Sequence, residues 1–138
     1  MLIADIMISS VITARPQETI RRALAMLEDL DIRHLPVVDD EGRLVGMVSD
    51  RDLREFWGTG EEIDEGSADD PLGTAIAEVM SADVVTVDSQ EDVSAAIDSM
   101  IEYRIGALPV LDQTTGELVG IISYVDLLRL ARDLLREG

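Results

Sequence analysis

The feature that most constrains the fold of this chain is an internal duplication. Residues 46–52, Gly-Met-Val-Ser-Asp-Arg-Asp, return at residues 120–126 as Gly-Ile-Ile-Ser-Tyr-Val-Asp, with glycine, serine and aspartate in matching places. The rest of the two halves also matches, with corresponding residues 73 positions apart. One turn is a residue longer in the second half, so after it the corresponding residues are 74 positions apart. Such self-similarity indicates two copies of one supersecondary unit. A copy of about fifty residues buries little apolar surface alone, so we expect the two to pack together.

The first copy predicts a helix, a hairpin and a second helix. Thr19 is a residue type suited to a helix N-cap. The residues that follow have the i, i+3, i+4, i+7 spacing of a buried helical face: Ile20, Ala23, Leu24 and Leu27. Residues 35–38 and 44–48 read as two strands joined by the turn at 39–42, which favours a hairpin. We expect the next helix to begin after Ser49.

The second copy predicts the same elements. Asp92 takes the N-cap place of Thr19, and residues 108–111 and 118–120 repeat the strands. The helical face is also repeated, by Val93, Ala96, Ile97 and Met100. One face of the final helix is expected to carry Leu127, Leu128, Ala131, Leu134 and Leu135.

Composition excludes several classes of function. The net charge is −18, all eleven basic residues are Arg, and Cys is absent. The absence of Cys excludes disulfides, thiolate metal sites and cysteine nucleophiles. So negative a chain repels phosphate backbones and anionic lipids, so we expect no binding to nucleic acid or membranes. With no signal-peptide pattern and no apolar run of membrane-spanning length, a soluble cytoplasmic protein is expected. The acidity would also suit a high-salt or GC-rich host.

Residues 58–73 separate the two copies and are rich in Asp, Glu and Gly. This composition favours an exposed linker. A calcium loop is the alternative, but the acids lack the spacing of an EF-hand and no closing Glu follows.

The Ser-x-x-Asp pairs, Ser49 with Asp52 and Ser123 with Asp126, allow two interpretations. At a strand-to-helix junction this pattern is typical of a capping box, in which each side chain satisfies a free backbone donor. A hydroxyl and a carboxylate in the same place can also bind the edge of a sugar. The residues themselves leave both interpretations open.

The two copies together resemble the CBS domain, the cystathionine-β-synthase type. The resemblance rests on Leu-Pro-Val-Val/Leu-Asp, a Gly turn, and Leu-Val-Gly-x-x-Ser-x-x-Asp-Leu, each present twice and in order, and it spans about residues 3–128. It implies an α/β (α+β) fold of two pseudo-symmetric β-α-β-β-α units packed as one CBS pair, or Bateman module. We assign unit 1–57, linker 58–73, and unit 74–138 with its C-terminal helix.

The resemblance implies a regulatory module that binds an adenosine-containing ligand, such as AMP, ADP, ATP or S-adenosylmethionine, in clefts between the two copies. By analogy with the family, Asp52 and Asp126 would hold the ribose hydroxyls, and Ser49 and Ser123 would contact ribose or phosphate. The adenine slot would be lined by Val11, Ile12 and Thr13, and by Val84, Val85 and Thr86. No cofactor is required, although magnesium would accompany a triphosphate.

Basic residues distinguish the two implied sites. In the family, phosphates are often reached from positions that here hold Arg33, His34 and Arg51; the second copy has Gly106, Ala107 and Val125 there. Because phosphate on so acidic a chain needs local cations, the Asp52 site is expected to hold the charged nucleotide. The Asp126 site would be empty, borrow an arginine from the other copy, or hold a weakly charged adenosyl ligand. The simpler alternatives are a surface histidine, and arginines paired with nearby acids such as Asp31 or Asp50.

The resemblance and the composition bear on three classes of function. A sensor that signals to an effector protein in trans, as a homodimer, is what the resemblance implies. The alternative is a ligand-independent oligomerisation or interaction scaffold, which the cation-poor second site favours. An enzyme is not expected, because one His, no Cys, no Lys and no metal-ligand cluster leave no catalytic constellation.

Overall fold

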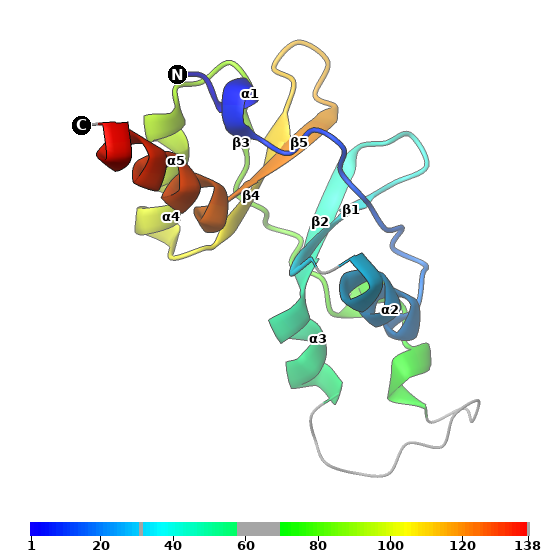
Figure 1. Ribbon diagram of the computed structural model, residues 1–138. Helices are drawn as coiled ribbons and strands as arrows, with labels where there is room; N and C mark the ends of the chain where they lie inside the picture. Colours follow the sequence, from blue (N-terminus) through cyan, green and yellow to red (C-terminus); the bar gives the residue numbers. More distant parts are fainter. Residues whose placement is uncertain (31, 58–69, 138) are drawn as a thin grey trace. The chain divides into compact units, whose positions relative to one another are not determined.

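The computed structural model describes residues 1–30, 32–57 and 70–137 (Figure 1). The chain divides into two compact units. Unit 1 comprises Met1–Val11 and Val85–Gly138, and unit 2 comprises Ile12–Val84. Both contain helices and a small sheet, so the predicted α+β class is confirmed. These compact units differ from the sequence copies, because the opening residues of each copy belong with the hairpin of the other.

Unit 2 contains α2 (Ile20–Leu30), β1 (His34–Val38), β2 (Leu44–Ser49), α3 (Asp50–Trp57) and the short 3-10 turns η1 (Pro71–Gly73) and η2 (Ile76–Glu78). The Thr19 hydroxyl accepts a hydrogen bond from the Arg22 amide at 3.2 Å, so the predicted N-cap is confirmed. Strands β1 and β2 form the predicted antiparallel hairpin, with His34 opposite Ser49. The core contains Ala14, Ile20, Ala23, Leu27, Leu35, Val37, Val48, Leu53 and Ile76.

Unit 1 contains α1 (Ile3–Ile6), β3 (Val87–Asp88), α4 (Val93–Tyr103), β4 (Ala107–Leu111), β5 (Leu118–Ser123) and α5 (Tyr124–Glu137). Strand β3 is parallel to β4, and β4 is antiparallel to β5. Asp92 caps α4 as predicted, accepting from the Ser94 amide at 3.0 Å. Hydrogen bonds from Ser94, together with the chain's amino group, lower the pKa of Asp92 to about 2. The core contains Ile3, Val87, Ala96, Met100, Leu108, Val110 and Ile122.

The opening segments of the two copies are exchanged reciprocally. In unit 1 the Ile3 amide donates to the Glu91 carbonyl at 2.9 Å; in unit 2 the matching Ile76 amide donates to Glu18 at 2.8 Å. Each segment ends in a methionine that packs on the glycine of the other copy's second hairpin strand. A Cβ at Gly46 would lie 2.5 Å from the Met80 Sδ, and one at Gly120 would lie 2.5 Å from the Met7 Sδ.

The first strand of each copy is shorter than the resemblance implies and begins further along the chain than residues 11–13 and 84–86. Among residues 11–14 of the first copy, Ala14 alone forms a bridge, to Val37 in β1, and in the second copy β3 begins at Val87. The chain passes from one unit to the other immediately before these points, between Val11 and Ile12 and between Val84 and Val85.

Only the end of the predicted linker lies within the described residues, because residues 58–69 lie outside them. Asp70 is 7% exposed, pairs with Arg21 at 2.5 Å and accepts from the Leu72 amide at 3.0 Å. Residues 70–73 are therefore attached to α2 of unit 2 rather than extended into solvent.

Candidate functional site

Four of the predicted site residues come together at one end of the β1–β2 hairpin in unit 2. The strand register places His34 opposite Ser49, and the Asp50 amide donates to the Arg33 carbonyl at 2.9 Å. Helix α3 begins at the next residue, Asp50, so the side chain of Asp52 returns to the end of the strand. The hairpin and the helix start thus place Arg33, His34, Ser49 and Asp52 close to one another.

Ser49 and Asp52 form a capping box. The Ser49 amide donates to Oδ2 of Asp52 at 3.1 Å, and the Asp52 amide donates to the Ser49 hydroxyl at 3.0 Å. Both side chains therefore stabilise the start of α3 without any ligand. The second oxygen of Asp52, Oδ1, receives no hydrogen bond from the part of the chain that the structure describes. The capping role leaves this oxygen available, so the structural and the ligand interpretations are compatible.

His34 is half-buried and electrostatically linked to this box. Burial lowers the pKa of its imidazole below the usual 6.5. The Asp52 carboxylate raises the pKa of His34, whereas the Arg33 guanidinium lowers it, and burial outweighs the effect of Asp52. The ring is therefore largely neutral at pH 7. His34 is thus neither fully exposed nor fully buried, and both interpretations of this residue stay predictions.

The arginines of the predicted site differ in their partners. Arg51 pairs with Glu55 one turn further along α3, at 3.1 Å, and both side chains are exposed. Asp50, a proposed alternative partner, pairs instead with Arg54 at 2.9 Å. Asp31, the other alternative, lies outside the described residues. Arg33 has no ion pair with any residue in the described ranges. An exposed pair such as Arg51–Glu55 is worth little, so a ligand phosphate can displace it.

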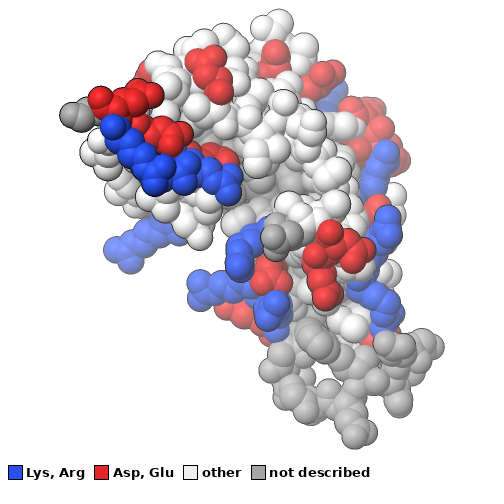
Figure 2. All heavy atoms as spheres, viewed as in Figure 1, with Lys and Arg blue, Asp and Glu red and all other residues white. Residues whose placement is uncertain are grey.

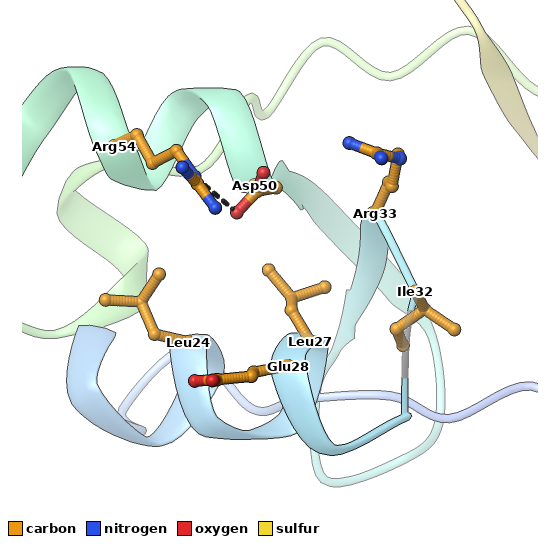
Figure 3. Close-up of a pocket in the computed structure, with 7 residues that line it drawn as sticks. All are labelled: Leu24, Leu27, Glu28, Ile32, Arg33, Asp50 and Arg54. Atoms are coloured by element: carbon orange, nitrogen blue, oxygen red, sulfur yellow. Dashed lines mark hydrogen bonds and ion pairs between the residues drawn. The ribbon is translucent and has the colours of Figure 1, made fainter.

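A pocket of about 500 Å³ opens beside the hairpin end (Figure 3). Its walls come from α2, the segment before β1 and the start of α3: Leu24, Leu27, Glu28, Ile32, Arg33, Asp50 and Arg54. Of the predicted site residues only Arg33 lines it. The sequence did not point to the other charged lining residues, Glu28, Asp50 and Arg54, as site residues. A position-by-position comparison of the two copies singles them out, because the second copy has Ile101, Tyr124 and Leu128 in their places.

The equivalent place in unit 1 lacks the basic residues found in unit 2. Ser123 and Asp126 form the same capping box, with the Ser123 amide donating to Oδ2 of Asp126 at 2.8 Å. Ala107 faces Ser123 across the hairpin, where unit 2 has His34. Gly106, in the place of Arg33, lies under Tyr124, since a Cβ there would be 3.2 Å from the Tyr124 ring. An aromatic ring thus replaces the arginine beside the second box.

The residues predicted to line an adenine slot fall where the chain passes between the units. Val11, Val85 and Thr86 belong to unit 1, whereas Ile12, Thr13 and Val84 belong to unit 2. None of them lies in a helix or strand, and Ile12 is 43% exposed. Their role remains a prediction.

The described ranges also bear on metal binding and on membrane insertion. These residues contain no cluster of three or more His, Asp or Glu that would hold a metal ion. Likewise, no helix among them has the length and apolarity needed to cross a membrane.

Comparison with known proteins gives consistent matches. A family model for the CBS domain matches residues 3–58 and 76–133. A CBS domain-containing protein of Dictyostelium discoideum is 33% identical over 131 residues, which cover 94% of this chain and 90% of that protein. An inosine-5'-monophosphate dehydrogenase of Methanocaldococcus jannaschii is 30% identical over 125 residues, which are 91% of this chain but 22% of that enzyme. The chain thus spans only about a fifth of the enzyme's length.

Among solved structures, the CBS domain pair of the protein MJ0100 has a TM-score of 0.82 and 29% sequence identity. The match covers 96% of this chain and 97% of that one, which was solved in complex with 5'-methylthioadenosine and S-adenosyl-L-methionine.

Proposed function

The chain belongs to the CBS-domain family, and from this premise we propose that it is a regulatory module that binds an adenosine-containing ligand. The observation that carries the proposal is the arrangement at the hairpin end of unit 2. A capping box holds the Asp52 carboxylate in place and leaves one of its oxygens available to ribose hydroxyls. The solved pair with two bound adenosyl compounds supports this ligand class.

The ligands of the two copies differ in charge under this proposal. The Asp52 site has Arg33, His34 and Arg51 nearby and takes AMP, ADP or ATP, the last with magnesium. The Asp126 site has glycine, alanine and valine in the matching places. Guanidinium groups bind phosphate by charge-assisted hydrogen bonds, which the second site cannot supply itself. It therefore takes a ligand without phosphate, such as S-adenosylmethionine or 5'-methylthioadenosine.

The module acts on other proteins rather than on a substrate of its own. A ligand shifts a conformational equilibrium only when it binds two states with different affinity, and an effector protein in trans, or a second copy in a homodimer, receives that shift. The dehydrogenase relative matches only over 22% of its length, which supports a role separate from catalysis.

Isothermal titration at moderate salt with AMP, ATP and S-adenosylmethionine tests the proposal. We expect saturable heat with at least one of them, and its loss in Asp52→Ala for the phosphorylated ligands. The second candidate is a ligand-independent scaffold, which is favoured by the observation that both Ser–Asp pairs already have a structural role. Absence of heat with all three compounds would establish the scaffold instead.

A further inference from the structure

The pocket of about 500 Å³ in unit 2 has a use of its own beyond the expected nucleotide site. Of the residues expected to contact a nucleotide, only Arg33 lines this pocket. One wall of the pocket is apolar: Leu27 is 3% exposed, and Leu24 and Ile32 are half-buried. Leu24 and Leu27 point from α2 towards α3 (Figure 3). An apolar wall with a few charged groups at its edge, in a volume of this size, is typical of a site for a small molecule.

The charged side chains of the pocket leave one cation without a partner. Asp50 and Arg54 pair with each other at 2.9 Å. Arg33 is exposed and has no ion pair with any residue in the described ranges. Figure 3 shows Arg33 and Glu28 on opposite sides of Leu27. A guanidinium binds a carboxylate through two parallel hydrogen bonds, so Arg33 is the group that would bind an anion at its end of the pocket.

The acidic surroundings limit such an anion to a single negative charge. Glu28 lines the pocket, is exposed and has no ion pair within the part of the chain that the structure describes. Figure 2 shows acidic side chains spread over the face that it presents, in keeping with a net charge of −18. A second negative charge on a ligand in the pocket would be repelled by these acids. One carboxylate, by contrast, is balanced by Arg33.

The internal duplication provides a control for this pocket. The apolar wall has apolar counterparts in the second copy: Ile97, Met100 and Ile105. Gly106 replaces Arg33 there, and Tyr124 replaces Asp50. A Cβ on Gly106 would lie 3.2 Å from the Tyr124 ring, so the ring covers the point from which the Arg33 side chain extends in unit 2. The fold therefore forms without this cation, and its presence beside an apolar wall in unit 2 indicates a ligand.

We propose that the pocket binds a monocarboxylate with an apolar chain, with the carboxylate on Arg33 and the chain along the apolar wall. Under the proposed function Arg33 also reaches the phosphate of the nucleotide, so the two ligands compete for one guanidinium. The carboxylate therefore weakens nucleotide binding, and the nucleotide weakens carboxylate binding by the same factor. This competition rests on the proposed function, whereas the carboxylate site itself does not.

Isothermal titration of the full chain with butanoate, hexanoate and octanoate tests the site. Affinity should rise about fourfold for each methylene group that enters the pocket. Octanol, which lacks the charge, should bind at least about tenfold more weakly than octanoate. Arg33→Ala should remove this difference between acid and alcohol. The matched control, Arg22→Ala, changes an exposed arginine of α2 outside the pocket lining and should retain the difference.

Three outcomes would refute the carboxylate site. They are no binding of octanoate, affinities that do not depend on chain length, and equal affinity for octanoate and octanol in the wild type. Leu24→Gln gives a second variant, which changes the apolar wall and leaves Arg33 in place. It should bind octanoate more weakly and bind ATP as the wild type does. Circular dichroism verifies the fold of each variant.

Titration of ATP and of adenosine with and without saturating octanoate tests the competition. The affinity for ATP should fall at least about fivefold, and the affinity for adenosine should not change because adenosine has no phosphate. If octanoate binds and the affinity for ATP stays the same, the competition for Arg33 is refuted. If neither AMP nor ATP binds at all, the nucleotide proposal fails, and the titrations with carboxylates still decide the pocket.

Discussion

The Met80 side chain occupies the space above Gly46, with its Sδ 2.5 Å from the point where a Cβ would be built. The Ser81 carbonyl oxygen lies 3.0 Å from the same point. The glycine that opens the Gly-x-x-Ser-x-x-Asp motif therefore makes room for a segment that is distant in the sequence. The same relationship joins Gly120 to Met7 in unit 1.

Gly46→Ala should lower the free energy of unfolding by about 1–3 kcal/mol, because the added methyl group forces Met80 and the backbone at Ser81 to move. Urea denaturation measures this change. Gly73→Ala is the matched control, since nothing lies within 4 Å of its added Cβ, and it should be neutral or slightly stabilising. Combining Gly46→Ala with Met80→Ala should cost less than the sum of the two; strict additivity would show that the two residues do not interact.

Asp52→Ala and Asp126→Ala should have the same effect on stability and different effects on ligand binding. Each removes an acceptor from a capping box, which costs about 1 kcal/mol of unfolding free energy. Only Asp52→Ala should abolish AMP or ATP binding in isothermal titration. If both variants lose the same amount of nucleotide affinity, or neither loses any, the proposed difference in ligand between the two sites is wrong.

Arg51→Ala should weaken binding of ATP more than binding of adenosine, because its guanidinium is expected to reach phosphate and not the base. Stability should change little, since the exposed pair with Glu55 contributes at most about 1 kcal/mol. Arg43, which pairs with Glu41 at 3.6 Å in the hairpin turn, offers the control variant Arg43→Ala. Equal losses for ATP and adenosine would remove Arg51 from the phosphate site.

Protonation of His34 should destabilise the protein. Its pKa is lowered on folding by burial, so the unfolded chain binds more protons as the pH falls below 6.5. The contribution of neutral His34 is fully present above that pH and is lost as the pH falls towards the folded-state pKa. Between about pH 7.5 and about pH 5.5, the free energy of unfolding should fall more steeply in the wild type than in His34→Gln. If the free energy of unfolding depends on pH in the same way in both proteins, the lowered pKa of His34 is contradicted.

Local signals predicted the helices and hairpins well. Thr19 and Asp92 cap the helices as predicted, because a cap depends only on residues two or three places further along the chain. The hairpin turns are equally local: Gly42 and Gly116 both adopt the positive φ that favours glycine, at 80° and 74°.

Long-range features were less accessible to sequence reasoning. The exchange of opening segments depends on which copy Ile3 and Ile76 contact, and both copies offer the same residues, so the pattern cannot distinguish them. The position of Tyr124 over Gly106 depends on two differences between the copies, which lie 18 positions apart in the sequence. Neither difference by itself predicts that the ring lies over the glycine. The final helix illustrates the same limit: its apolar face is real, yet Leu128 and Leu135 are exposed while Leu127 packs on the core.

The reciprocal exchange of opening segments also bears on how such a chain can arise. In a polypeptide with a single repeat, the hairpin glycine would have no methionine packed against it. The methionine of the opening segment would likewise have no glycine to pack on. Two such polypeptides complete each other by trading these segments. In this chain the exchange takes place within one molecule, so neither unit is complete without residues from both copies.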